Sequence, residues 1–240
     1  MEIMNYSKVS DRKKMFEKSK CSTDKKIANF TKYVKRQNLA RFMVQYELFK
    51  RQLNIKGSII ECGVHNGGGV MAWAKISSIL EPYNYHRKIV GFDTFEGFPS
   101  FAKIDKENTQ VKTGMFSEDY DIYEELSICI EEYNENRFIN NIDKIELIKG
   151  DANITISQYV KNNKHLLVSL LYLDFDIYEP TKAALNYFVP RMSKGSIIAF
   201  DEINNKDWPG ETMAMIESLN INDYKIESFP FEPNISFIQL

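Results

Sequence analysis

Two strongly apolar runs in the second half of the chain each end in acidic residues, and this feature constrains the fold more than any other. The run 166–173 reads Leu-Leu-Val-Ser-Leu-Leu-Tyr-Leu and continues into Asp174-Phe-Asp176, and the run 196–200 continues into Asp201-Glu202. An uninterrupted apolar run is typical of a strand buried on both faces, as in parallel sheets covered by helices. The sequence therefore predicts an α/β fold.

The segment between the two runs, residues 179–189, is a predicted helix. It starts with Glu-Pro and carries apolar residues at helical spacing, and Pro180 suits an early helical position. A right-handed crossover from strand to helix to strand puts both strands in one sheet, with their carboxyl ends at the same edge. Asp174, Asp201 and Glu202 are then expected to converge at that edge, where ligands of open parallel sheets bind.

This convergence predicts a metal site. Three carboxylates in one place repel one another unless a cation lies among them, and ligation by oxygen alone suits a hard ion such as Mg²⁺. We therefore expect Asp174, Asp201 and Glu202 to bind a divalent metal. Acidic residues at strand ends also cap the helices that follow them, and the pattern alone leaves this alternative open.

A glycine-rich loop follows the first predicted strand, residues 58–62. It runs from Gly63 through Gly67 into a predicted helix over 70–80, and such loops bind nucleotides. It is not the dinucleotide motif G-x-G-x-x-G. Glu61 stands where the first glycine belongs, and three residues instead of two separate Gly63 from Gly67. A carboxylate there would repel a pyrophosphate but would pair with a cationic amino group, such as that of S-adenosylmethionine.

Two more predicted strands end near acidic residues. Asp93 follows the strand 88–92, a position where an acidic residue typically accepts hydrogen bonds from ribose hydroxyls. Phe95, in the next loop, is expected to flank an adenine ring. Asp151 follows the strand 145–149 and is expected to reach the adenine amino group. Asp93 could instead serve as a helix cap or a turn residue.

Charge is unevenly distributed along the chain. Residues 1–56 hold 15 Lys and Arg against 5 Asp and Glu, a balance of +10, so the remainder carries −12 within the total of −2. The basic segment would suit nucleic acid, the phosphates of a small substrate or an acidic partner subunit. It lacks an interleaved aromatic platform and no recognition module follows it, which argues against nucleic acid.

We expect two parts in the chain. Residues 1–56 are predicted to be a basic N-terminal arm, loosely held over 1–25, with one or two helices over 27–53, and residues 57–240 to be the catalytic domain. The apolar helices ahead of the sheet favour a homodimer. No signal peptide or membrane-spanning stretch is evident, so a cytoplasmic protein without a membrane partner is expected. Cys21, Cys62 and Cys129 are widely spaced and indicate neither disulfides nor a zinc site.

The segments around the expected site also carry predictions. Residues 100–120 lack periodicity and are expected to form a mobile segment over the site. Trp208 and Pro209 lie in a loop expected to form a wall for the acceptor substrate. The last two predicted strands, 224–229 and 235–240, are expected to form an antiparallel hairpin at the sheet edge.

Four motifs follow one another along the chain: Glu61-Cys-Gly63 with Gly67-Gly68, Gly91-Phe-Asp93-Thr-Phe-Glu-Gly97-Phe-Pro99, Leu173-Asp174-Phe-Asp176-Ile-Tyr178-Glu-Pro-Thr181, and Asp201-Glu202. With these motifs in this order, the chain resembles the macrocin O-methyltransferase family of sugar O-methyltransferases. The resemblance covers roughly residues 38–220, and it implies the class I methyltransferase fold. That fold has a Rossmann-like seven-stranded sheet with an antiparallel last strand and helices on both faces, here with an N-terminal helical extension. The resemblance also implies S-adenosylmethionine and a divalent metal as cofactors, and hydroxyls of deoxysugars, often nucleotide-linked, as acceptors.

The resemblance implies a role for each matching position. Glu61, Gly63 and Gly67 would hold the methionine part of the cofactor, Asp93 the ribose and Asp151 the adenine edge.

The metal ligands and the base follow from the same resemblance. Asp174, Asp201 and Glu202 would bind Mg²⁺, although the family usually has two consecutive Asp at the last pair. Asp174 or Asp176 would be the catalytic base.

Three other functions remain open at this stage. Phe98, Phe175 and Trp208 keep a flat apolar slot for a catechol or another small hydroxyl compound possible. A nicotinamide-dependent oxidoreductase would use a similar fold, but Glu61 and the altered glycine interval argue against it. A non-catalytic cofactor-binding protein would not need the acidic residues at the strand ends.

Overall fold

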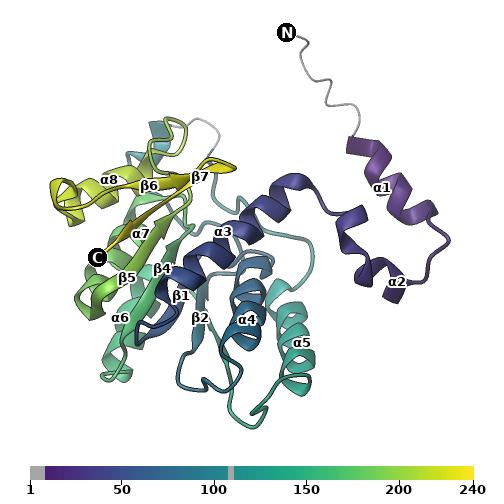
Figure 1. Ribbon diagram of the computed structural model, residues 1–240. Coiled ribbons are helices and arrows are strands. Elements are labelled where there is room, and N and C mark those ends of the chain that lie inside the picture. The colour runs from purple at the N-terminus through teal and green to yellow at the C-terminus, as the bar shows by residue number, and fades with distance from the viewer. Residues whose placement is uncertain (1–8, 108–110) are drawn as a thin grey trace. The chain divides into compact units, whose positions relative to one another are not determined.

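The computed structural model describes residues 9–107 and 111–240 (Figure 1). The chain divides into two compact units, with the division between Arg41 and Phe42. The division falls inside helix α3 (Arg36–Gln52), and the domain boundary expected after residue 56 stays a prediction.

The first unit contains α1 (Val9–Lys18), α2 (Thr23–Ala28) and the 3₁₀ turn η2 (Phe30–Lys32). From Val9 onward, the segment predicted to be a loosely held arm over 1–25 contains helices, and residues 1–8 lie outside the described residues. That the arm is loosely held stays a prediction. Ser22 caps α2 by accepting the Lys25 N–H at 3.4 Å. The ring of Phe16 packs edge-on against Tyr33, with centroids 5.1 Å apart, and this contact holds α1 on the segment that follows α2.

The second unit is built on a seven-stranded sheet in the order β3-β2-β1-β4-β5-β7-β6. The first five strands are parallel, and β7 pairs antiparallel with both β5 and β6. This confirms the predicted α/β fold with an antiparallel last strand and a hairpin at the edge. The strands are β1 (Ser58–Cys62), β2 (Ile89–Asp93), β3 (Ile145–Lys149), β4 (Val168–Leu173), β5 (Met192–Phe200), β6 (Glu227–Phe229) and β7 (Glu232–Gln239).

Helices cover both faces of the sheet (Figure 1). The part of α3 from Phe42 onward packs on one face with α4 (Gly68–Leu80) and α5 (Ile122–Glu135), and α6 (Ala152–Asn162), α7 (Tyr178–Phe188) and α8 (Pro209–Ser218) pack on the other. Neighbouring strand residues point to opposite faces, so Ile59 enters the first core and Ile60 the second. Short 3₁₀ turns are η3 (Asp105–Glu107), η4 (Val189–Arg191) and η5 (Ile221–Asp223).

Helix α6 has no counterpart among the sequence predictions. Asp151 caps it by accepting the Asn153 N–H at 2.9 Å, and Ile156 and Val160, one turn apart, are buried against the sheet.

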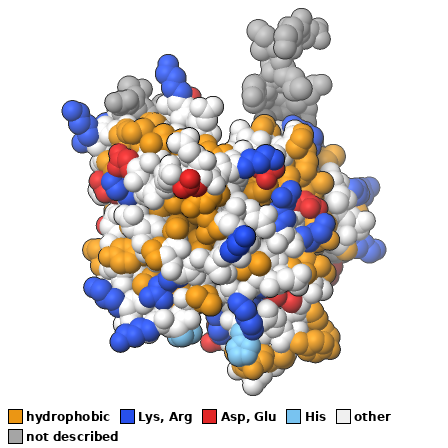
Figure 2. Space-filling model, turned by 60° about the vertical axis from the view of Figure 1, so that its left-hand side comes forward, with side chains coloured by type: hydrophobic (Ala, Val, Ile, Leu, Met, Phe, Trp, Pro, Cys, Tyr) orange, Lys and Arg blue, Asp and Glu red, His pale blue; other side chains and the backbone are white. Residues whose placement is uncertain are grey.

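Helix hydrophobicity and surface charge are the properties that bear on binding to a membrane or a polyanion. Within the described residues, no helix has both the length and the apolar character needed to cross a bilayer. On the face shown in Figure 2, Lys and Arg side chains are scattered among apolar and acidic ones and do not form one continuous basic patch.

Candidate active site

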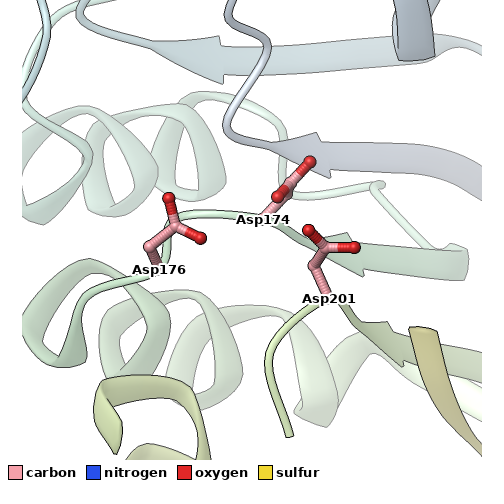
Figure 3. Close-up of side chains that lie close together, drawn as sticks. All are labelled: Asp174, Asp176 and Asp201. Carbon is pink, nitrogen blue, oxygen red and sulfur yellow. The ribbon is translucent and has the colours of Figure 1, made fainter. Parts of the chain in front are cut away.

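Three carboxylates lie around a common space beyond the carboxyl ends of β4 and β5 (Figure 3). Asp174 follows β4 directly, Asp176 lies two residues further on, and Asp201 follows β5. One carboxylate oxygen from each lies within 4.8 Å of the others. The strands pair in parallel with Leu173 opposite Phe200, so the residues that follow them emerge side by side. We call Asp174, Asp176 and Asp201 the acidic group.

The acidic group differs by one residue from the expected metal ligands, which are Asp174, Asp201 and Glu202. Asp176, expected only as a base, belongs to it, and Glu202 does not. The Glu202 carboxylate instead accepts a hydrogen bond from the side-chain amide of Asn205. Asp176 has a left-handed backbone with φ +62, a conformation that costs a non-glycine residue about 1–3 kcal/mol and occurs often at functional sites.

The residues present fit a hard divalent cation. The acidic group offers only oxygen ligands, the set that Mg²⁺ prefers. Glu211, in the first turn of α8, adds a fully buried carboxyl next to it. Burial raises the pKa of Glu211 well above its ordinary value, and the charges of Asp176 and Asp201 raise it further. Its Oε1 atom has no hydrogen-bond partner among the described residues. A cation at this place would compensate the concentrated negative charge.

The glycine loop lies next to the acidic group. Glu61, in β1, is only 2% exposed, and its carboxylate lies against Gly69 in the first turn of α4 so closely that a Cβ on Gly69 would clash with it. The carboxylate is therefore at the positive end of the helix dipole. Gly67, with φ +78, is the N-cap of α4. Gly63, with φ +92, lies against the backbone carbonyl of Asp174, with no room for a side chain.

Asp93 holds the glycine loop in place. Its Oδ2 accepts the backbone N–H groups of Val64 at 2.7 Å and His65 at 2.8 Å, and its Oδ1 accepts that of Phe95 at 2.7 Å. The Thr94 hydroxyl also lies 3.5 Å from Oδ1, but it donates its one proton at the shorter distance of 2.7 Å to the Gly97 carbonyl. A carboxylate can accept about four hydrogen bonds, so capacity for a ribose hydroxyl remains. The sequence placed Asp93 at the site but did not reveal this use of its carboxylate.

The two residues expected at the adenine are both engaged within the protein. Phe95 is 7% exposed, and its ring packs edge-on against Tyr123 at 5.3 Å in the core under α5. Asp151 caps α6, and its Oδ1 accepts both the backbone N–H and the side-chain amide of Asn153. The Gly150 N–H donates to the Asp93 carbonyl at 2.9 Å, which keeps the ends of β2 and β3 together. Contact with adenine stays a prediction for both residues.

An aromatic cluster of Phe98, Phe116 and Trp208 lies beside the glycine loop. The Phe98 ring is 5.3 Å from Phe116 and 6.3 Å from Trp208, and the ring of His65 is 5.9 Å from Phe116. Phe175, expected to share a flat slot with Phe98 and Trp208, instead packs in the core on the α7 face.

Part of the segment expected to be mobile is attached to this cluster. The Gly114 N–H donates to the Phe98 carbonyl at 3.0 Å, and the Phe98 N–H donates to that of Met115 at 3.2 Å. Residues 108–110 of the segment lie outside the described residues.

The family profile for macrocin O-methyltransferases (TylF) matches residues 3–216. The chain belongs to the macrocin O-methyltransferase family. It is an S-adenosylmethionine-dependent O-methyltransferase with the class I fold, which decides against the nicotinamide-dependent oxidoreductase.

Solved structures agree with this assignment. The crystal structure of CalS11, described as a calicheamicin methyltransferase, is 29% identical with a TM-score of 0.91, and the match covers 99% of this chain and 94% of that one. An apo structure of CalS11, described as a TDP-rhamnose 3′-O-methyltransferase of calicheamicin biosynthesis, is 26% identical with a TM-score of 0.84, covering 99% and 96%. The O-methyltransferase NovP, at 17% identity and a TM-score of 0.62 over 83% and 79%, shares the fold. No curated protein sequence matches the chain.

Sequence reasoning missed two buried carboxyl groups in this methyltransferase. Glu211 is one. Asp105 is the other: it is 2% exposed, its Oδ1 accepts the Tyr178 N–H at 3.1 Å and its Oδ2 accepts that of Ala102 at 2.9 Å. Burial raises the pKa of Asp105. Asp105 comes from a segment without periodicity, and acidic residues such as Glu211 are common in the first turn of exposed helices, so neither gave a signal in the sequence.

Proposed function

We propose that the protein transfers a methyl group from S-adenosylmethionine to a hydroxyl of a deoxysugar, that the sugar is nucleotide-linked, and that Mg²⁺ bound by the acidic group takes part. The observation that carries the proposal is the backbone contact between Gly63 of the cofactor loop and Asp174 of the acidic group. The contact supports a methyl donor bound next to the proposed metal site. The relative described as a TDP-rhamnose 3′-O-methyltransferase, matched over nearly its whole length, supports the nucleotide-linked acceptor.

The cofactor would lie over the glycine loop. Glu61 would pair with the amino group of the methionine part, and the backbone of Gly63 and Gly67 would leave room for its close approach. Asp93 would bind the ribose through its remaining acceptor capacity, and Asp151 would reach the adenine edge from the neighbouring strand end. Phe95, which is buried, would support the adenine site from below rather than by stacking.

Methyl transfer from sulfonium to oxygen is an in-line displacement. The acceptor oxygen must lie about 3 Å from the methyl carbon, and its proton must be removed, because a sugar hydroxyl is a weak acid. Mg²⁺, when bound, would supply a positive charge that stabilises alkoxide character on the acceptor oxygen. Asp174 or Asp176 would take the proton, and Asp201 would complete the ligand set. A carboxylate that binds the cation directly is the weaker base, so the two roles fall to different members of the acidic group.

The acceptor would be bound by apolar and basic side chains. Trp208 and Phe98 would offer an apolar wall, and Lys or Arg residues of the basic segment 1–56 would hold the diphosphate of a nucleotide-linked sugar. A homodimer formed through the N-terminal helices remains part of the proposal.

Mass spectrometry of acceptor mixtures tests the proposal directly. The protein is incubated with S-adenosylmethionine, Mg²⁺ and a panel of nucleotide-linked deoxyhexoses, free deoxyhexoses and catechols, with and without a chelator. Methylation of a nucleotide-linked sugar that stops with the chelator supports it. Preferred methylation of catechol, or turnover that the chelator leaves unchanged, contradicts it. Equal rates on free and nucleotide-linked sugars would contradict the role of the basic residues.

A further inference from the structure

Glu211 connects the two loops that carry the acidic group. Its Oε2 accepts the backbone N–H of Glu202, in the loop after β5, at 3.1 Å. The backbone N–H of Asp176, in the loop after β4, also donates to this carboxylate. A single side chain from α8 therefore binds the backbone of both loops.

The sheet fixes only the first residue of each loop. The Asp174 N–H donates to the Cys62 carbonyl at 2.8 Å, and the Asp201 N–H donates to the Leu173 carbonyl at 3.1 Å, so both continue the hydrogen bonding of the strands. Asp176 lies beyond that pattern and has the left-handed backbone conformation. Its position relative to Asp201 therefore depends on contacts from outside the sheet.

The start of α8 is closely packed, which fixes the position of Glu211. A Cβ on Gly210 would come within 2.5 Å of Asp105 Oδ1 and 2.6 Å of the Tyr178 backbone nitrogen. Asp105 in turn accepts the Tyr178 N–H at the start of α7. Only a residue without a side chain lets α8 approach α7 this closely, and the next residue then projects a carboxyl group toward the acidic group.

Burying a carboxyl next to two others costs free energy, and a neutral side chain would avoid that cost. Glu211 is 0% exposed, and its Oε1 has no hydrogen-bond partner among the described residues. Oε2 accepts the Glu202 N–H, and the Asp176 N–H donates to the same carboxyl group. These two loop amides are the partners that account for a carboxyl group at this buried position.

We propose that Glu211 is a positioning residue for the metal site: it holds the Asp176 and Glu202 loops at the spacing that a divalent cation requires. This inference rests on the proposed metal dependence. Residues that orient metal ligands in this way typically change metal affinity or activity by about 10 to 100-fold when they are replaced.

Two substitutions test the role of these hydrogen bonds. Glu211→Gln keeps the shape and one acceptor oxygen for the loop amides, whereas Glu211→Ala removes the hydrogen bonds. Glu217→Gln is the matched control, because Glu217 lies on the same helix, is exposed and binds Lys182 at the surface. Mn²⁺ affinity is measured by electron paramagnetic resonance, and S-adenosylmethionine affinity by the shift in melting temperature.

We expect Glu211→Ala to weaken Mn²⁺ binding about 10 to 100-fold, and Glu211→Gln, which keeps an acceptor oxygen, to weaken it less. Affinity for S-adenosylmethionine should change less than about twofold in both variants, and Glu217→Gln should match the wild type. Unchanged Mn²⁺ affinity in both Glu211 variants would overturn the inference alone. Equal losses of Mn²⁺ and S-adenosylmethionine binding in Glu211→Ala would also overturn it, because they indicate a purely structural role. A wild-type protein that binds no Mn²⁺ and ignores chelators would overturn the proposed metal dependence as well.

Discussion

Gly63 and Asp174 are in backbone contact, although 111 positions separate them in the chain: a Cβ atom on Gly63 would come closer than 3.0 Å to the carbonyl oxygen of Asp174. The Asp174 N–H donates to the carbonyl of Cys62, the residue before Gly63, at 2.8 Å. The cofactor loop and the acidic group are thus joined through main-chain atoms of adjacent strands. Their distance is therefore a property of the sheet and does not depend on flexible side chains.

Gly63→Ala should destabilise the protein and separate the two halves of the site. Gly63 has φ +92, and a left-handed backbone alone costs a substituted residue about 1–3 kcal/mol. The clash with the Asp174 carbonyl adds to this cost, since neither main chain can move without breaking strand pairing. Gly114→Ala is the control, because Gly114 has φ +76 but nothing within 4 Å of its added Cβ. Urea unfolding should show the larger loss for Gly63→Ala, and equal losses would refute the importance of the contact.

Asp174→Asn should abolish turnover while leaving the affinity for S-adenosylmethionine nearly intact. The substitution removes a proton acceptor and a charged metal ligand, whereas the glycine loop and Glu61 remain. Single-turnover kinetics and calorimetric binding of the cofactor measure the two effects separately. Asp176→Asn, tested alongside, identifies the base: the variant that still binds Mn²⁺ but does not turn over lacks it. Unaltered turnover in Asp174→Asn would contradict its assignment.

Asp93→Asn should lower stability as well as cofactor affinity. An amide has only one acceptor oxygen, so the side chain can no longer serve Val64, His65 and Phe95 together. The backbone amides left without a partner cost about 1–3 kcal/mol in total stability. Asp151→Asn is a suitable comparison, because both hydrogen bonds of Asp151 go to a single oxygen, which an Asn retains. If Asp93→Asn lost cofactor affinity with no change in the free energy of unfolding, its role in holding the loop would be refuted.

The sequence predicted the parts of the site that follow from strand order. Asp174 and Asp201 come together because each directly follows a buried strand, and parallel pairing of these strands leaves little freedom for the next residue. Asp176 and Glu202 follow the first residue after each strand and no longer take part in strand pairing. The direction of their side chains depends on a buried contact with Glu211, which lies on a helix further along the chain. Local pattern contains no information on that contact.

The sequence does not predict helices α1 and α6, because neither has a clear run of apolar residues at helical spacing. Residues 9–18 are mostly polar, and among the described residues the Phe16 ring of α1 contacts Tyr33 and lies under the Lys26 ammonium group. Residues 152–162 mix apolar and polar side chains, and the position of Asp151, directly before them, predicts a ligand of adenine as readily as the helix cap that the structure shows. A residue that caps a helix and one that binds a ligand have the same sequence signature, so only coordinates separate them.

Lys144 is a buried cation at the end of the sheet opposite the site. It is 4% exposed, its Nζ donates to the Asn84 carbonyl at 2.7 Å, and Glu81 Oε1 is 4.0 Å away. Burial lowers the pKa of Lys144 from 10.5 to about 8, and the attraction of Glu81 offsets only part of this effect. In the folded protein Lys144 therefore loses its proton at a lower pH than in the unfolded chain.

This difference makes stability depend on pH with a definite sign. Between about pH 8 and pH 10.5 the unfolded state binds more protons at position 144, so Lys144 makes the free energy of unfolding rise with pH, by roughly 1 kcal/mol per unit. Lys144→Met lacks this contribution. Burial also raises the pKa values of Tyr133 and Tyr159, which therefore titrate above 10 and affect both proteins alike. Urea unfolding from about pH 7.5 to 9.5 should show the wild type gaining stability relative to Lys144→Met, whereas parallel pH profiles would show that the Lys144 pKa is not lowered.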